Sequence, residues 1–353
     1  MDFSFTDEQH ELRRAVRDLA TDRSTSAHVR AAVAGPTGHD PALWKLVAGD
    51  LGLAGLAVSE DAGGTGGSFV DLAVALEEAG RSLLPVPLLP SAVAAVALER
   101  ASSRLEGGAG RSDVLGRIAV GEAVATIAVG EVEVSGGALT GELRHVVDGA
   151  LADVVLLASP GGLWLVHTSV AGVVVQPRPT LDPTRRQATV RLASTSAARV
   201  GDGPAAAHAV DLLRIALSVE AVGVARWCLE TTVDHLKTRV QFDRPIGSFQ
   251  ALQHRAADLV VLLESAASTA YYAAWAAASA PDEVPVVAPL ALSVCGDAAY
   301  RIAADTIQLH GGIGFTWEHD AHLYFKRATA TRLLLGDSHE QRRLVAERAD
   351  IGP

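Results

Sequence analysis

The hydrophobic periodicity changes twice along this chain, and these changes limit the folds open to it. In the first hundred or so residues, and again from about Pro204, apolar residues recur at helical spacing, as at Leu12, Val16 and Leu19. Between these zones lie short β-branched runs such as DVVLLAS and ATVRLAS, separated by Gly, Pro and Asp. Long helices do not alternate with these runs, so we do not expect a parallel Rossmann sheet.

This change of periodicity predicts an α+β fold of three parts: an N-terminal helical domain at 1–114, a middle antiparallel β domain at 115–203 and a C-terminal four-helix bundle at 204–353. Thr6 is expected to cap the first helix. A later helix is expected to run from Phe69 to Ala79 and to be ended by the prolines of LLPVPLLP. In the last part, Ser248 is expected to cap a helix.

Composition limits the compartment and the partners. A net charge of -11 argues against nucleic acid or an anionic membrane as partner. Cys228 and Cys295 lie among apolar residues and are predicted to be buried free thiols in a reducing compartment. The start MDFSFTDEQHELRRAV lacks the apolar stretch of a signal peptide. Glu264 interrupts the best candidate for a membrane span, so we expect a cytoplasmic protein.

Three short motifs have a structural and a functional interpretation. GGTGG at 63–67 does not follow a strand, and it is interpreted as a flexible turn between helices. HGGIGF at 310–315 follows a helix, and its paired glycines permit either a left-handed exit or close approach of a ligand to the backbone. His319, Asp320 and His322 fit no zinc pattern and are interpreted as a solvated helix start, so no metal site is predicted.

RVQFDRPIGSFQ at 239–250 is the most informative stretch. Arg239 falls at the end of a long apolar helix, where a cation suits the helix dipole. Gln241 and Gln250 flank Phe242 and Phe249. A guanidinium group and amides beside aromatic surface suit a diphosphate joined to a flat ring system. A helix end held by a salt bridge is the alternative, and the residues alone leave both open.

Two C-terminal motifs in order resemble the acyl-CoA dehydrogenases: RVQFDRPIGSFQALQHRAADL, and later QLHGGIGFTWEHDAHLYFKRA. The N-terminal MDFSFTDEQHELRRAVRD and LGLAGLAVSEDAGGTGGSFVDLAVALEEAGRSLLPVPLL are similar to that family too, so the resemblance covers nearly the whole chain. It implies a helical domain, a β domain and a four-helix bundle, in agreement with the periodicity.

The resemblance implies a chemistry with three requirements. FAD accepts hydride from the β-carbon of an acyl-CoA thioester, a glutamate removes the α-proton, and hydrogen bonds to the thioester carbonyl acidify that proton. In the family one subunit holds the flavin ring and a neighbour's bundle holds the ADP half. The match assigns ADP-side contacts to Arg239, Gln241, Phe242, Gln250, Gln308, Gly311 and Gly312.

The ring-binding half departs from the family pattern. The family's Thr-Glu-Pro…Gly-Ser-Asp stretch is replaced by ATIAVGEVEVSGG. In the following LTGELRHVVDGALAD, the part RHVVDG lacks the aromatic and hydroxyl residues that contact the ring in the family.

The catalytic base is also missing. Most members place a glutamate before a glycine, as in Tyr-Glu-Gly-Thr, where this chain has Leu335 before Gly336. A second subgroup places it at the position of Leu213. Leucine accepts no proton, and a positioned base is worth about 10²–10⁴ in rate. Asp337 and Glu220 are the possible substitutes.

The resemblance therefore implies the non-catalytic, β-type subunit of a heteromeric α2β2 acyl-CoA dehydrogenase, as in actinobacterial steroid side-chain degradation. A partner subunit would supply the glutamate, an acyl-CoA would be the substrate, and an electron-transferring flavoprotein would be the acceptor. Two alternatives stay open: a self-sufficient homotetramer with a relocated carboxylate, and a flavin-free scaffold.

Overall fold

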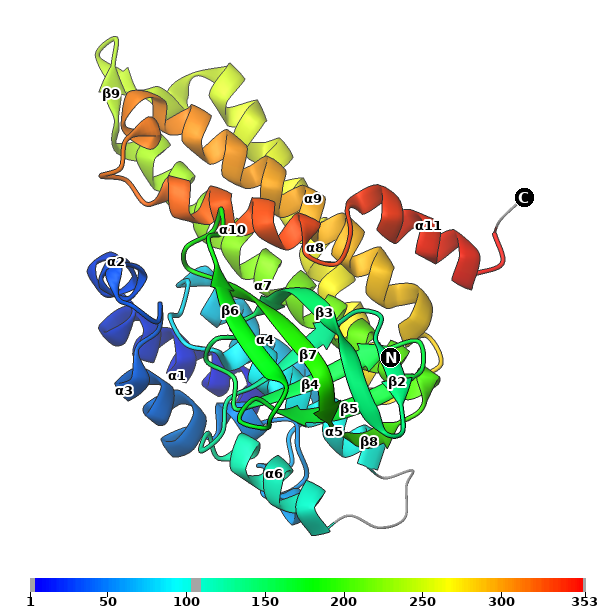
Figure 1. The fold of residues 1–353 in the computed structure, drawn as a ribbon. Coiled ribbons are helices and arrows are strands. Elements are labelled where there is room, and N and C mark those ends of the chain that lie inside the picture. Colours follow the sequence, from blue (N-terminus) through cyan, green and yellow to red (C-terminus); the bar gives the residue numbers. More distant parts are fainter. Residues whose placement is uncertain (1–3, 103–108, 352–353) are drawn as a thin grey trace. The chain divides into compact units, whose positions relative to one another are not determined.

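The computed structural model describes residues 4–102 and 109–351, which form two compact units. The helical unit comprises Met1–Val29, Ala73–Leu84 and Leu217–Pro353, and the β unit comprises Arg30–Leu72 and Pro85–Ala216. Along the chain, helices come first, strands follow and helices return, as the periodicity predicts (Figure 1). The domain boundaries at 114 and 203 stay a prediction.

The N-terminal helices begin with the predicted cap. The Thr6 side chain accepts from the backbone N–H of Gln9, and the Gln9 side chain accepts from the backbone N–H of Thr6. These two N–H groups at the start of α1 are therefore both hydrogen-bonded. The helices are α1 (Asp7–Arg23), α2 (Ser26–Ala34), α3 (Pro41–Trp44), α4 (Phe69–Arg81), α5 (Leu88–Ser102) and α6 (Ala109–Ala119), and a π-helical turn, Lys45–Asp50, extends α3.

Two expectations for this region need correction. The prolines of LLPVPLLP separate α4 from α5, but Pro90 lies within the first turn of α5, where no intrahelical donor is lost. GGTGG is not a loose turn, because the N–H groups of Gly64, Thr65 and Gly66 donate to carbonyls of residues 55–59.

The β unit contains two four-stranded sheets, ordered β1-β4-β5-β8 and β2-β3-β7-β6. The strands are β1 (Ala125–Val129), β2 (Glu133–Ser135), β3 (Ala138–Val147), β4 (Val154–Ser159), β5 (Gly162–His167), β6 (Val173–Arg178), β7 (Gln187–Ser196) and β8 (Ala198–Gly201). Strand pairing is antiparallel as expected, except that β1 and β4 are parallel. Inward-facing residues from both sheets, among them Leu139, Leu157 and Val190, form one buried core.

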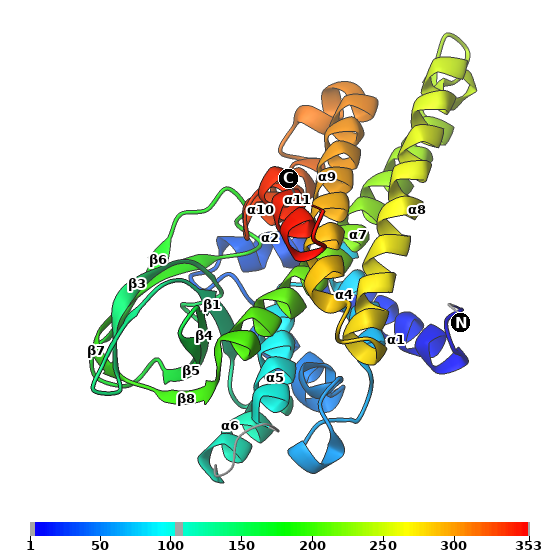
Figure 2. The ribbon, with the colours of Figure 1, turned by 90° about the vertical axis from the view of Figure 1, so that its right-hand side faces the viewer.

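The C-terminal helices are α7 (Gly203–Thr238), α8 (Gln250–Ser279), α9 (Val284–His310), α10 (Ala321–Leu333) and α11 (Ser338–Arg348). In the helical unit, α9 packs against α8, α10 and α11, and Figure 2 shows α8 and α9 as long rods. One helical stretch, Val284–Phe315, is long and apolar enough to cross a membrane, but 61% of its most apolar window is buried, as in a core helix. Ser248 does not cap α8, because it lies in the preceding 3₁₀ turn and Phe249 takes the cap position.

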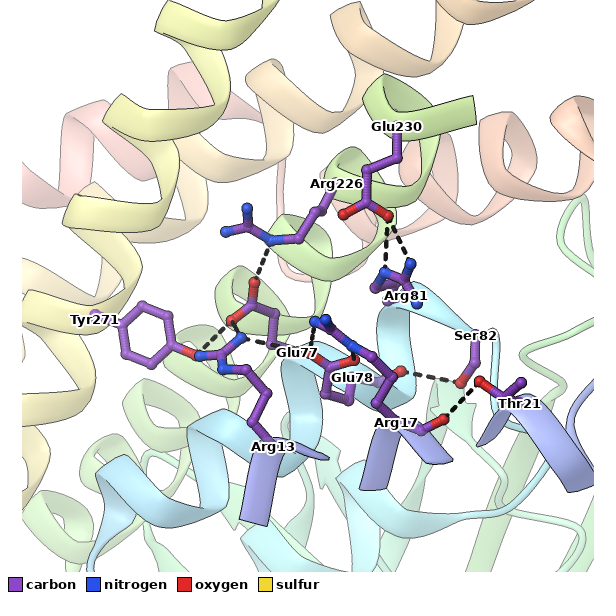
Figure 3. Close-up of polar contacts among 10 residues, drawn as sticks. All are labelled: Arg13, Arg17, Thr21, Glu77, Glu78, Arg81, Ser82, Arg226, Glu230 and Tyr271. Atoms are coloured by element: carbon purple, nitrogen blue, oxygen red, sulfur yellow. Dashed lines mark hydrogen bonds and ion pairs between the residues drawn. The ribbon is translucent and has the colours of Figure 1, made fainter. Parts of the chain in front are cut away.

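A close contact fixes α4 against α7. A Cβ atom on Gly223 of α7 would lie 1.9 Å from the carbonyl oxygen of Glu77, so only glycine permits this approach. The contact brings Glu77, whose side chain is fully buried, into a polar cluster shared by four helices (Figure 3).

That cluster is fully paired. Glu77 accepts from Arg13 at 2.7 Å, from Arg226 at 2.7 Å and from the hydroxyl of Tyr271. The neighbouring Glu78 accepts from Arg17 at 2.6 Å and 3.0 Å. Burial alone would raise the pKa of Glu77, but the charges of Arg13 and Arg226 outweigh it and hold that pKa below its ordinary value. We interpret this cluster as the polar joint between α1, α4, α7 and α8.

Candidate functional site

The segment after α7 forms a short exposed hairpin. Strand β9 (Val240–Gln241) pairs with β10 (Arg244–Pro245), and the two loop residues, Phe242 and Asp243, have φ of 56° and 61°. Two successive left-handed residues are typical of a type I′ hairpin turn, and here both carry side chains instead of the usual glycine. The Phe242 side chain is 85% exposed. A strained, exposed aromatic residue is a feature that functional sites tend to hold.

The segment after α9 exposes bare backbone. Gly311, at φ 64°, ends the helix, and a Cβ atom on Gly311 or Gly312 would meet nothing within 4 Å. Gly314 differs, because a Cβ atom there would lie 2.6 Å from the carbonyl oxygen of Ile307. The first two glycines therefore leave room for a ligand at the backbone, whereas the third is required for packing.

A histidine pair brings these two segments together. His235 of α7 stacks on His310 of α9 with ring centroids 4.5 Å apart. Hairpin 239–249 and loop 311–317 therefore lie at the same end of the helical unit, seen at the upper left in Figure 1. The sequence placed both segments in one site only through the family resemblance, and this contact places them side by side.

The predicted side chains of this end face solvent. Arg239, Gln241, Gln250 and Gln308 are exposed, and Gln241 donates to the carbonyl of Val240 at 2.9 Å. Within residues 4–102 and 109–351, Arg239 takes part in no ion pair. The other cation of the hairpin, Arg244, lies over the ring of Phe249 at 4.1 Å. An exposed guanidinium group next to bare backbone can bind a diphosphate.

Sequence reasoning missed two aromatic residues at this end. Phe315 is 89% exposed and Trp317 is 69% exposed, with Lys326 over the Trp317 ring at 4.7 Å. The run GFTW, which places aromatic residues directly after the glycines, was the available signal. Together with Val240, Phe242 and Ile313 they form an apolar tip, so this end is suited to contact with another molecule.

The positions matched to the catalytic base carry no carboxylate. Leu335 lies just before Gly336, at φ 96°, and its carbonyl accepts from Gln341 at 2.6 Å. Leu213, in the β unit, is 5% exposed.

Both substitute carboxylates are engaged elsewhere. Asp337 caps α11 by accepting from the N–H groups of His339 and Glu340, and the bond from Glu340 is the main reason that its pKa is lowered. Glu220 is buried and lies 3.1 Å from Arg327. A lowered pKa and a buried ion pair both work against proton abstraction from carbon.

A cavity of about 310 Å³ lies elsewhere in the helical unit, among α1, α4, α7 and α10. Arg17 and Arg81 line it, but each is bound to a glutamate, Glu78 and Glu230 respectively. None of the residues that the sequence assigns to the cofactor or to the base lines it. Among the described residues no group of three or more side chains could hold a metal ion.

Comparison with known proteins gives the class of the fold. The match to a family model described as acyl-CoA dehydrogenase, N-terminal domain, covers residues 6–104, and the match to the corresponding C-terminal domain covers residues 201–349. Fold and motifs together define an acyl-CoA dehydrogenase-like oxidoreductase.

Individual relatives agree with this class. Acyl-CoA dehydrogenase IpdE2 of Mycobacterium tuberculosis is 39% identical over 342 residues, which are 97% of each chain. The steroid acyl-CoA dehydrogenase Tcur3481-Tcur3483 superposes with a TM-score of 0.90 at 30% identity over 98% of each chain. The ChsE4-ChsE5 complex from Mycobacterium tuberculosis superposes with a TM-score of 0.90 at 28% identity over 100% of each chain. The chain belongs to the acyl-CoA dehydrogenase family.

Proposed function

We propose that this chain is the non-catalytic subunit of a heteromeric, FAD-dependent acyl-CoA dehydrogenase, working in the cytoplasm on a steroid-derived CoA thioester. FAD, when bound, supplies the hydride acceptor. This chain contributes contacts to the ADP end of the cofactor and the helical surface for assembly. A partner chain contributes the flavin-ring pocket and the glutamate that removes the α-proton.

The observation that carries the proposal is leucine at both positions matched to the base, Leu335 and Leu213. The two nearby carboxylates do not replace it. Asp337 is bonded to backbone N–H groups that favour its charged form, and Glu220 is buried against Arg327. The proposal therefore assigns abstraction of the α-proton to another chain.

The nucleotide end supports the other half of the proposal. Arg239 supplies a cation, Gly311 and Gly312 supply accessible backbone, and Phe242 supplies an exposed ring. These groups fit a diphosphate and its attached nucleoside. They lie on a solvent-facing tip, where a neighbouring subunit's cofactor could reach them.

The similar proteins support a heteromer. Tcur3481-Tcur3483 is described as a steroid acyl-CoA dehydrogenase, and ChsE4-ChsE5 is described as a complex of two proteins. The steroid substrate rests on this similarity, and the electron-transferring flavoprotein that we expect as acceptor rests on the family resemblance.

The test is purification of this chain alone and together with a co-expressed family member that carries the catalytic glutamate. We expect the chain alone to oxidise no CoA thioester, and the complex to be yellow with one FAD for each pair of unlike chains. Arg239→Ala in the complex should reduce the bound flavin, because it removes the cation at the diphosphate.

The alternatives give different results in the same experiment. A homotetramer with a relocated base would carry one FAD per chain and would be active alone. A flavin-free scaffold would carry no flavin even when its partner is present. Either result would overturn the proposal.

A further inference from the structure

Three histidine rings lie in contact at the base of the candidate nucleotide site. His310 is in the middle, with its ring centroid 4.5 Å from that of His235 and 4.4 Å from that of His319. His310 is 5% exposed. The three rings come from α7, from the end of α9 and from the segment before α10, so they connect three separate parts of the chain.

The hydrogen bonds fix where two of the neutral rings carry their proton. Nδ1 of His310 lies 2.8 Å from the carbonyl oxygen of Thr306, which can only accept, so this nitrogen donates. The remaining Nε2 of His310 is the atom that would take up a proton. Nδ1 of His319 accepts from the N–H of Ala321 at 3.1 Å, so the neutral ring carries its proton on Nε2.

Protonation has a cost at His319. A proton on His319 would occupy Nδ1 and break the bond to the N–H of Ala321 at the start of α10. The neutral ring of His319 is therefore compatible with this contact, and the doubly protonated ring is not. His310 packs between the rings of His235 and His319.

The surrounding charges favour the neutral form. Burial lowers the pKa of His235, and His310 of α9 and Arg239, just after α7, lower it further. Burial also lowers the pKa of His319, and His310, His235 and His322 add to this effect, while Asp320 opposes it. Asp320 itself accepts from the hydroxyl of Ser26 at 2.8 Å.

Each ring adjoins residues of the candidate site. The carbonyl of His235 accepts from the N–H of Arg239 at 2.9 Å, and His310 directly precedes Gly311. His319 closes the loop that begins at Gly311. Repulsion among protonated rings would therefore move Arg239 away from the accessible backbone of Gly311 and Gly312.

We propose that His235, His310 and His319 are positioning residues whose neutral stack holds hairpin 239–249 against loop 311–317, and that protonation of the stack loosens the grip on the flavin nucleotide. This inference rests on the proposed function for its ligand. It makes the assembly hold its cofactor at neutral pH and release it on acidification.

The first arm of the test uses the chain alone, without flavin. His310→Asn keeps a donor for the Thr306 carbonyl, and His319→Asn keeps an acceptor for the N–H of Ala321, but neither asparagine titrates. Because the folded-state pKa values of His235 and His319 lie below the ordinary value of 6.5, the stability that these two neutral rings contribute is complete above about pH 6.5 and falls as pH falls below it. We expect the Tm of the wild type to drop more steeply below that pH than the Tm of either variant. His254→Asn, on the exposed side of α8, is the control and should follow the wild type.

The second arm uses the complex with its partner and measures FAD retained after gel filtration. We expect the apparent dissociation constant for FAD to rise as the pH is lowered, by up to about tenfold per pH unit for each proton that the stack takes up when the nucleotide is released. The rise between about pH 7.5 and pH 5.5 should be reduced in His310→Asn. His319→Leu, which cannot accept from Ala321, should weaken retention at every pH.

The two arms separate the possible failures. Equal Tm slopes in the wild type and both asparagine variants would overturn the stack as a titrating device. A flattened Tm profile with an unchanged pH dependence of FAD retention would overturn its link to the nucleotide. Absence of FAD from the wild-type complex at about pH 8 would instead overturn the proposed function, and the Tm arm would still report on the stack.

Discussion

At the scale of single residues, the turn of hairpin 239–249 combines strain with exposure. Phe242 and Asp243 both have left-handed backbone, and neither side chain is needed to fill a core. A left-handed residue with a Cβ atom costs roughly 1–2 kcal/mol, less for Asp. This strain occurs at a solvent-facing position, as expected where the side chains of Phe242 and Asp243 contact a ligand.

We therefore predict that Asp243→Gly stabilises the chain by about 0.5–1 kcal/mol, because glycine adopts this backbone without steric strain. Urea unfolding of the isolated chain measures the change. Asp258→Gly, within helix α8, is the matched control and should destabilise by about 0.5–1 kcal/mol. A loss of stability in Asp243→Gly would show that the Asp243 side chain is itself stabilising.

The glycines of loop 311–317 offer a second prediction. Gly314→Ala should destabilise the chain by about 1–3 kcal/mol, because its Cβ atom would overlap the Ile307 carbonyl. Gly312→Ala should leave stability nearly unchanged, because its Cβ atom meets open space, yet it should reduce FAD retention in the complex. Thermal unfolding and flavin absorbance separate the two effects. If Gly312→Ala and Gly314→Ala lost flavin equally and did not differ in stability, the separate roles of the two glycines would be contradicted.

The cysteines give a third prediction at this scale. Burial raises the pKa of the Cys228 thiol to about 12, and burial likewise raises the pKa of Cys295. Because the thiolate is the reactive form, neither should react with a disulfide reagent in the native chain at neutral pH. Two equivalents should react after denaturation in guanidinium chloride. One fast native thiol would show that a cysteine is accessible.

At the scale of elements, the buried cluster around Glu77 connects helices distant in sequence. Glu77→Gln would leave the half-buried Arg13 and Arg226 without the negative charge that they share, and should destabilise the helical unit by about 3 kcal/mol. Glu347→Gln, in an exposed pair with Arg343, should change stability by less than about 0.5 kcal/mol. Chemical unfolding at neutral pH compares them.

The same cluster has a distinct pH dependence. The pKa of Glu77 in the folded chain lies below its ordinary value of 4.5, so its contribution is complete above about pH 4.5 and is lost as pH falls further. The histidine stack acts at higher pH, below about 6.5. Glu77→Gln should flatten the acid limb of the stability profile and leave the histidine limb in place.

The elements also show how far the sequence leads. Strong local signals predict Thr6 as a cap, the β-branched strands and the long C-terminal helices, because each signal acts within a few residues. Helix α11 and the parallel pairing of β1 with β4 were not predicted. Both depend on packing partners distant in sequence, such as the contact of α11 with α9.

The candidate site was likewise only partly predictable from the sequence. Arg239 and the paired glycines carry a local pattern, which the family resemblance sharpens into a nucleotide contact. The stack of His235 on His310 joins residues 75 positions apart, and no local pattern reports such a pair. The engagement of Glu220 by Arg327 likewise needed three-dimensional contacts.

At the scale of the whole molecule, leucine at the matched base position is one of several departures from the family pattern. Leu335→Glu would restore a carboxylate at the matched position, but the segments matched to the ring pocket, ATIAVGEVEVSGG and RHVVDG, would remain different. We therefore predict that Leu335→Glu, purified alone, oxidises no CoA thioester and gains no stoichiometric FAD. Absorbance at the flavin band and an acceptor-dye assay measure both. Activity in this single variant would show that the chain retains a complete ring pocket.

The apolar tip formed by Val240, Phe242, Ile313, Phe315 and Trp317 has a consequence for production in the cell. A copy of this chain that has no partner exposes these apolar side chains to chaperones and proteases. Surplus molecules should therefore precipitate or be degraded. Under the proposed function, organisms that make this chain would benefit from translating it and its partner subunit in equal amounts from one transcript.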